Sequence, residues 1–134
     1  MTLLCLDSSG FVKRFVAEDG SDLIHAAIND AGALAMCRVG FVETVRAVAR
    51  AGDRRDVKRV ERYWQGIDVV EVDATLAEKA AALAITHGLR TLDALHLAAA
   101  LSLPSRDLIF ATWDRRLHEA ARAEGLAVLP GALP

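Results

Sequence analysis

Five short apolar segments restrict the fold of this chain more than any other feature of its sequence. They span residues 3–6, 33–37, 69–72, 108–111 and 126–129. None of them alternates apolar with polar residues, as a strand with one solvated face does, so each is predicted to be a strand buried on both faces. Stretches with helical spacing of apolar residues separate them. This order predicts an α/β fold, a parallel sheet with helices on both sides and right-handed crossovers.

Capping residues place the predicted helices. Ser8 is expected to cap a helix to about residue 17, Ser21 one to about 29, Asp73 one that ends near Gly88, and Thr91 the next. The Thr91 helix is apolar nearly all round and is therefore predicted to be buried. Further helices are expected around residues 41–49, 54–65 and 113–123. The 134 residues fit a single domain over 1–134 with one sizeable core.

Charge and cysteine content limit the classes of partner and compartment. The formal net charge is −2, so a polyanion would have to be held by a local basic patch or by metal ions. The two cysteines, Cys5 and Cys37, lie inside apolar segments and outside any zinc-binding pattern, which indicates buried thiols in a reducing compartment. The first residues lack a basic start, and their apolar segment is too short for a signal peptide or membrane span. We expect a cytoplasmic protein without a membrane segment.

Four acidic residues occupy equivalent places, at strand ends and helix starts. Asp7 follows the first predicted strand, Glu43 and Asp93 lie in the first turns of two helices, and Asp114 follows the fourth strand. Ligands of open α/β sheets bind beyond the carboxyl ends of the strands. Each acid alone is also explained by helix capping or by the helix dipole. If all four converge, their mutual repulsion requires shared protons or a bound cation, and oxygen ligands favour Mg²⁺ or Mn²⁺ over zinc.

At these acids the chain resembles the PIN-domain ribonucleases, and its compact length resembles the VapC-type toxins of toxin–antitoxin systems. The resemblance runs through four motifs in order and covers the chain from end to end. The motifs are Leu-Cys-Leu-Asp-Ser-Ser at 4–9, Phe-Val-Glu-Thr-Val-Arg-Ala at 41–47, Leu-Asp-Ala-Leu-His-Leu-Ala-Ala-Ala at 92–100 and Ala-Thr-Trp-Asp-Arg-Arg-Leu at 111–117. The resemblance implies a three-layer α/β/α domain with a mainly parallel five-stranded sheet in the order 3-2-1-4-5.

The chemistry that the resemblance implies is metal-dependent cleavage of RNA phosphodiester bonds. Asp7, Glu43, Asp93 and Asp114 match the acidic positions of the family, as metal ligands and catalytic residues. Thr112 matches a hydroxyl position at which it would orient an acid or a water. A bound Mg²⁺ or Mn²⁺ would activate the attacking water and offset charge on the phosphate. Some family members carry a further acid where this chain has Arg116, which argues against a second metal ion.

Several basic and aromatic residues are candidates for RNA contact. Residues 46–62 contain seven basic and three acidic side chains, a local charge of +4 that would guide an RNA backbone or simply form a solvated helix face. Arg115 and Arg116 adjoin Asp114 and are candidates for phosphate contact. Tyr63 and Trp64 would stack on bases or pack against the core. His96 is expected to be packed and hydrogen-bonded.

The resemblance also implies partners: an RNA substrate (tRNA, rRNA or mRNA), a cognate antitoxin whose helix lies in an apolar groove, and a second copy of the chain in a homodimer. Two other enzyme classes fit less well. A haloacid-dehalogenase-like phosphatase needs an acid where this chain has Ser9, and a receiver domain needs a late lysine, whereas no lysine follows Lys79. The remaining alternative is a non-catalytic PIN-like module that acts through protein or RNA contacts.

Overall fold

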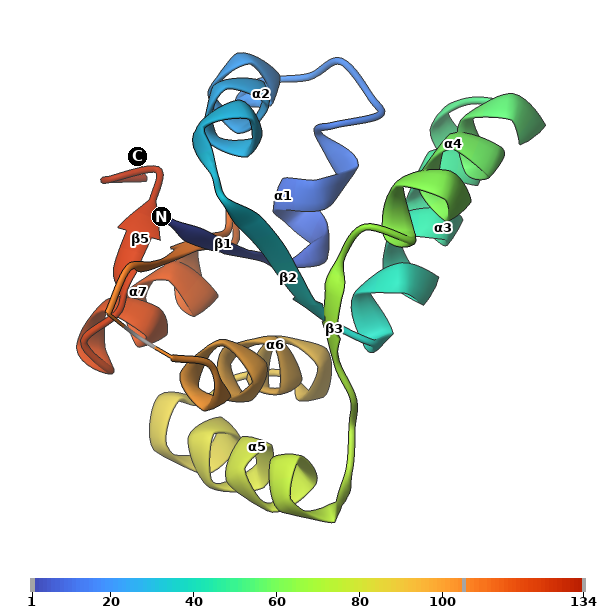
Figure 1. The fold of residues 1–134 in the computed structure, drawn as a ribbon. Helices are drawn as coiled ribbons and strands as arrows, with labels where there is room; N and C mark the ends of the chain where they lie inside the picture. The colour runs from blue at the N-terminus through green and yellow to red at the C-terminus, as the bar shows by residue number, and fades with distance from the viewer. Residues whose placement is uncertain (1, 105, 134) are drawn as a thin grey trace.

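A five-stranded parallel sheet forms the centre of the molecule (Figure 1). The computed structural model describes residues 2–104 and 106–133. The strands are β1 (Leu3–Leu6), β2 (Ala33–Cys37), β3 (Asp68–Val70), β4 (Leu108–Ala111) and β5 (Ala127–Leu129). They lie in the order β3-β2-β1-β4-β5, and every neighbouring pair is parallel. The predicted strands and the sheet order are confirmed, although β3 begins one residue before its predicted segment and ends two residues before the end of that segment, and β5 is one residue shorter than predicted.

Helices cover both faces of this sheet. They are α1 (Ser8–Val12), α2 (Ser21–Asp30), α3 (Val39–Ala51), α4 (Arg54–Trp64), α5 (Ala74–His87), α6 (Thr91–Ser102) and α7 (Arg115–Ala123). In Figure 1 the first four lie on one side of the sheet, and α5, α6 and α7 lie on the other. This arrangement is the predicted three-layer α/β/α fold.

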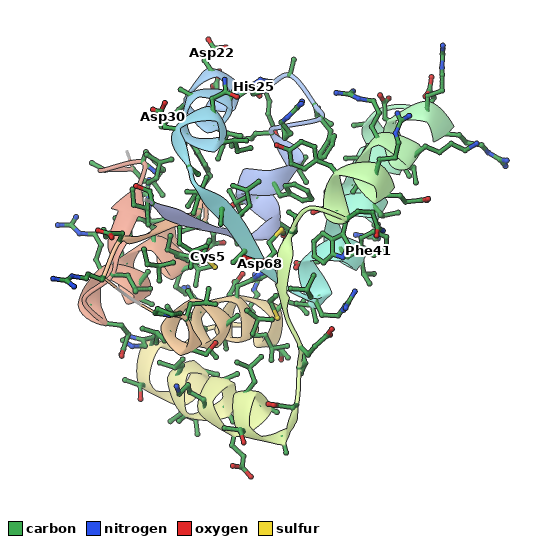
Figure 2. All side chains as sticks on the ribbon, viewed as in Figure 1. Cys5, Asp22, His25, Asp30, Phe41 and Asp68 are labelled. Carbon is green, nitrogen blue, oxygen red and sulfur yellow. The ribbon has the colours of Figure 1, made fainter. Side chains whose placement is uncertain are left out.

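The two faces of the sheet bury two separate apolar clusters. Leu4 and Leu6 of β1 pack with residues of α1 to α4, whereas Cys5 between them packs with α5, α6 and α7. Successive side chains of a strand point to opposite faces, so a strand covered on both sides needs apolar residues at every position. Figure 2 shows Cys5 in the interior, while Asp22 and His25 project from the outer side of α2.

Three of the predicted helix starts are wrong by one residue. Asp7, and not Ser8, is the N-cap of α1, because its carboxylate accepts a hydrogen bond from the backbone N–H of Gly10. Gly20, with a φ of 92°, stands at the N-cap of α2 in place of Ser21, and Arg90 stands before α6 in place of Thr91. The first helix also ends at Val12, well before residue 17. Ser21 instead donates its hydroxyl hydrogen to the carbonyl of Val16, so it holds the loop between α1 and α2.

The central helix α6 is buried as predicted, with Leu97 and three consecutive alanines almost wholly inaccessible to solvent. It lies against the sheet and packs on α5 (Figure 1). Small side chains allow this close approach of helix to helix and helix to sheet. In the described part of the chain, every helix is too short or too polar to cross a bilayer.

Candidate active site

Asp7 lies at the carboxyl end of β1, where it serves both as a helix cap and as the centre of a polar cluster. Its side chain accepts hydrogen bonds from the Gly10 backbone N–H (2.9 Å), the Ser9 hydroxyl (2.7 Å) and the Thr112 hydroxyl (2.6 Å). Only 3% of Asp7 is exposed. Burial raises the pKa of this carboxyl above its usual value, and the charge of His96 and then the hydrogen bonds oppose that rise.

Thr112 connects the end of β4 to the end of β1. Its buried hydroxyl donates to Asp7 Oδ2 and accepts the backbone N–H of Asp114 at 3.1 Å. Ser9 makes a parallel connection, since its hydroxyl donates to Asp7 and accepts the backbone N–H of Trp113 at 2.9 Å. These hydrogen bonds therefore fix the position of Asp7 relative to the segment that precedes Asp114. Thr112 is a predicted site residue, whereas Ser9 is not, because its only signal in the sequence is a hydroxyl two residues after the acid.

Asp114 is the N-cap of α7. Its Oδ1 accepts a hydrogen bond from the backbone N–H of Leu117 at 2.9 Å, so helix capping, the alternative explanation for this acid in the sequence, is correct. The same is true of Asp7 at α1. A carboxylate that accepts one N–H bond still has free lone pairs, so capping leaves both side chains able to accept further bonds.

Asp93 lies in the first turn of α6, and the charges of the other three acids affect its pKa. The pKa of Asp93 is raised from 3.8 to about 6, first by partial burial and then by the charges of Asp114 and Asp7, with a smaller contribution from Glu43. Such mutual effects require short separations, because charges far apart are screened by solvent. The charges of the other three predicted acids therefore reach Asp93 from the carboxyl end of the sheet, Glu43 most weakly, and we call Asp7, Glu43, Asp93 and Asp114 the acid cluster.

His96 holds Glu43 at the border of this cluster. Its Nε2 lies 2.6 Å from Glu43 Oε1, across 53 positions of sequence. The imidazole is 1% exposed, and its Nδ1 has no hydrogen-bond partner among the described residues. The prediction that His96 is packed and hydrogen-bonded is confirmed, and its partner is one of the four acids.

The two arginines beside Asp114 lie on the surface at the start of α7. Arg115 is exposed and borders a hollow of about 560 Å³ together with Trp113 and Asp19. Arg116 is also exposed, and its Nη1 donates to the carbonyl of Gly88 at 3.3 Å. Within residues 2–104 and 106–133, no lysine or arginine forms an ion pair with Asp7, Asp93 or Asp114.

Comparison with known proteins identifies the family of this chain. The sequence model of the PIN domain family matches residues 4–123, a range that includes the whole acid cluster. The chain belongs to the PIN domain family. Among curated relatives, Ribonuclease VapC45 from Mycobacterium tuberculosis (strain CDC 1551 / Oshkosh) is 37% identical over 142 residues, with 99% of each chain covered.

Solved PIN-domain structures share the fold at low sequence identity. VapC20 from Mycobacterium tuberculosis, a toxin that cleaves the sarcin–ricin loop, superposes with a TM-score of 0.75 at 15% identity and covers 98% of this chain and 99% of its own. A toxin–antitoxin complex from Klebsiella pneumoniae contains a chain with a TM-score of 0.72 at 16% identity, covering 100% of both chains. These likenesses establish the fold of this PIN domain.

The PIN-domain acid cluster suits a hard divalent ion by its chemistry. Its ligands are carboxylate oxygens, and within the described chain no lysine or arginine pairs with them, whereas His96 contacts Glu43. The carboxylates do not form a closed cage: over the described residues, no three His, Cys, Asp or Glu side chains stand close enough together to hold a metal. Mg²⁺ usually keeps several waters and binds only one or two carboxylates, so a closed cage is not required.

Proposed function

We propose that this chain is a divalent-metal-dependent ribonuclease that hydrolyses phosphodiester bonds in RNA, and that it is the toxin of a toxin–antitoxin module. The observation that carries the proposal is that Asp7, Asp93 and Asp114 lie within electrostatic reach of one another with no lysine or arginine of the described chain paired to them. The pKa of Asp93 is raised to about 6, first by burial and then by the charges of Asp114 and Asp7. A fold tolerates such repulsion where a bound cation relieves it.

In this proposal the acid cluster holds Mg²⁺ or Mn²⁺. When bound, such an ion lowers the pKa of a coordinated water and offsets the charge that develops on phosphate oxygens. Thr112 and Ser9 keep the Asp7 carboxylate in one orientation through their hydroxyl hydrogens. His96 does the same for Glu43. Fixed carboxylates lose little conformational freedom on binding an ion, which favours binding.

The substrate and the partners extend what is known of similar proteins. VapC45, at 37% identity over the whole length, is named a ribonuclease, and this supports RNA as the substrate. The Klebsiella pneumoniae neighbour is a toxin–antitoxin complex, which supports an antitoxin partner. We further propose a homodimer, and a cytoplasmic location in which the free, buried thiols of Cys5 and Cys37 stay reduced. Arg115 and Arg116 are proposed to contact phosphates.

A cleavage assay on total tRNA and rRNA tests the proposal. The wild-type chain is expected to cut RNA with Mn²⁺ or Mg²⁺ and to stop when EDTA is added. Asp93→Asn should reduce the rate by at least about a hundredfold, since removal of one electrostatic group of an active site has effects of this size. Glu119→Gln, an exposed acid on α7, is the matched control and should cut normally.

Two results would contradict the proposal. Full cleavage activity of Asp93→Asn would show that the acid cluster takes no part in the reaction. RNA binding without any cleavage at millimolar Mn²⁺ would favour the non-catalytic PIN-like module instead.

A further inference from the structure

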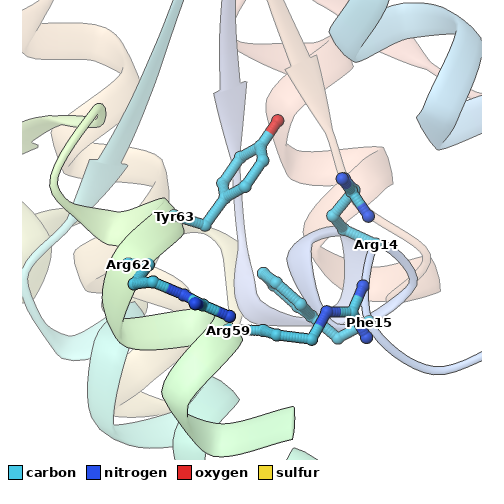
Figure 3. A pocket seen from close by; sticks show the side chains of 5 residues that line it. All are labelled: Arg14, Phe15, Arg59, Arg62 and Tyr63. Carbon is cyan, nitrogen blue, oxygen red and sulfur yellow. The ribbon is translucent and has the colours of Figure 1, made fainter. Parts of the chain in front are cut away.

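A second polar hollow lies on the side of the sheet that carries α1 and α4. It has a volume of about 280 Å³, close to the lower end of the range for small-ligand sites. We call it the arginine pocket, and its lining residues are Arg14, Phe15, Arg59, Arg62 and Tyr63. Figure 3 shows these side chains, with Arg14 and Phe15 beyond the end of α1 and the other three on α4. The pocket contains three cations and two aromatic rings, and none of them belongs to the acid cluster.

Two of the three guanidinium groups stack on aromatic rings, and two of the three have no acidic partner in the described chain. Arg14 lies 5.0 Å from the ring centre of Tyr63, and Arg59 lies 5.7 Å from that of Phe15. Arg59 pairs with Asp56 at 3.4 Å, whereas Arg14 and Arg62 form no ion pair within the described chain. Stacking on rings orients planar donors in advance, so less conformational freedom is lost when they bind an anion.

The aromatic rings rest on the core and are partly open to solvent. Phe15 and Tyr63 contact each other with ring centres 5.8 Å apart, and both contact the fully buried Phe11. A partly exposed ring that is supported by the core and flanked by arginine side chains is a platform on which an unpaired base can stack. Guanidinium planes offer the same kind of surface.

The negative charge of the acid cluster opposes RNA binding, so attraction for RNA has to come from another part of the surface. Its carboxylates repel the phosphates of RNA, and a net charge of −2 gives the chain little long-range attraction for a polyanion. Asp7 is the N-cap of α1, and turns closed by backbone hydrogen bonds continue past Val12 to Phe15. At 1.5 Å per residue, the eight positions from Asp7 to Phe15 correspond to about 12 Å along the helix axis, which is about three to four nucleotides of a stacked strand.

We propose that the arginine pocket binds one nucleotide of a single-stranded RNA substrate, with its phosphate on the arginines and its base on the Phe15–Tyr63 surface. The pocket would hold the strand while a bond about three or four nucleotides away lies at the acid cluster. This inference rests on the proposed function only for the identity of the ligand.

Binding of a fluorescein-labelled oligouridylate of about twelve nucleotides tests the inference, measured by anisotropy in EDTA so that no cleavage occurs. The variant Arg14→Gln/Arg59→Gln/Arg62→Gln should weaken binding about tenfold or more. The slope of log Kd against log salt should fall by about 0.7 for each phosphate that the variant no longer neutralises. The control Lys79→Gln/Arg106→Gln/Arg122→Gln removes the same charge from exposed positions outside the pocket and outside residues 46–62 and should change Kd less than about threefold.

The stacking part is tested with Tyr63→Leu, after its unfolding midpoint shows that it folds. We expect about a tenfold loss of oligouridylate affinity. A poly-glutamate peptide of about twelve residues serves as a polyanion without bases. If it binds the wild type as tightly as the RNA, and Tyr63→Leu leaves both affinities unchanged, the pocket receives an acidic protein segment and the proposal is wrong.

The outcomes separate this inference from the proposed function. Equal losses of oligouridylate affinity in the pocket and control variants would overturn the proposal for the arginine pocket, even if the wild type cleaves RNA with Mn²⁺. Selective loss in the pocket variant, combined with no cleavage under any condition, supports the pocket and overturns the ribonuclease proposal. A wild type that neither binds nor cleaves RNA overturns both.

Discussion

Replacing Asp93 by asparagine should stabilise the metal-free protein at neutral pH. The folded structure raises the pKa of Asp93 from 3.8 to about 6, so ionisation of this side chain opposes folding. That difference corresponds to at most about 3 kcal/mol. Solvent screening at a half-buried carboxylate reduces it, and the lost interaction with the α6 dipole subtracts up to about 1 kcal/mol more. We expect a net gain of about 1 kcal/mol, or roughly 4 °C in the unfolding midpoint.

The sign of the pH dependence follows from the direction of the shift. Because the folded-state pKa lies above the ordinary value, the wild type loses stability as the pH rises from about 4 through 6, and the loss is complete above that range. Asparagine does not titrate, so the advantage of Asp93→Asn should be largest near pH 7.5 and shrink towards pH 4. Urea unfolding in EDTA at these two pH values measures both quantities.

Glu119→Gln provides the control for this experiment. It makes the same change of carboxylate to amide on an exposed face of α7 and should alter the free energy of unfolding by less than about 0.5 kcal/mol at either pH. A destabilised Asp93→Asn at pH 7.5, or a gain that does not depend on pH, would refute the electrostatic reasoning, since the crowding of the four acids would then impose no cost.

Two further predictions concern the same site. Millimolar Mn²⁺ or Mg²⁺ should raise the unfolding midpoint of the wild type in a concentration-dependent manner, because binding at ten times the Kd adds about 1.4 kcal/mol to the free energy of unfolding, and calorimetry of Asp7→Asn should show no such rise; an unchanged wild-type midpoint would argue against metal binding. Thr112→Val should cost about 2 kcal/mol in urea unfolding, because it leaves the buried Asp7 carboxylate without a 2.6 Å hydrogen bond. Thr112→Ser keeps the hydroxyl and should cost less than about 1.5 kcal/mol; a stable Thr112→Val beside a destabilised Thr112→Ser would show that the methyl group, and not the hydrogen bond, matters.

Local sequence signals predicted the strands and most of the helices. Strands such as β1 and β4 are recognisable because burial on both faces demands continuous apolar residues, a property of adjacent positions. The N-caps of α1, α2 and α6 each lie one residue before the predicted position, because backbone geometry sets where a helix begins. At α1 both Asp7 and Ser8 have capping side chains, and that geometry selects Asp7.

The sequence by itself determined that acids stand at the ends of β1 and β4 and near the starts of α3 and α6. Strand ends and helix starts are both marked by the pattern of neighbouring residues. The tertiary structure alone decided that Ser9 and Thr112 join those two strand ends, and that His96 meets Glu43 across 53 positions. It also set the raised pKa of Asp93 and brought Arg14 beside Tyr63. Contacts of this kind depend on how layers of helices pack over the sheet, and pairwise distances across the fold are not encoded in neighbouring residues.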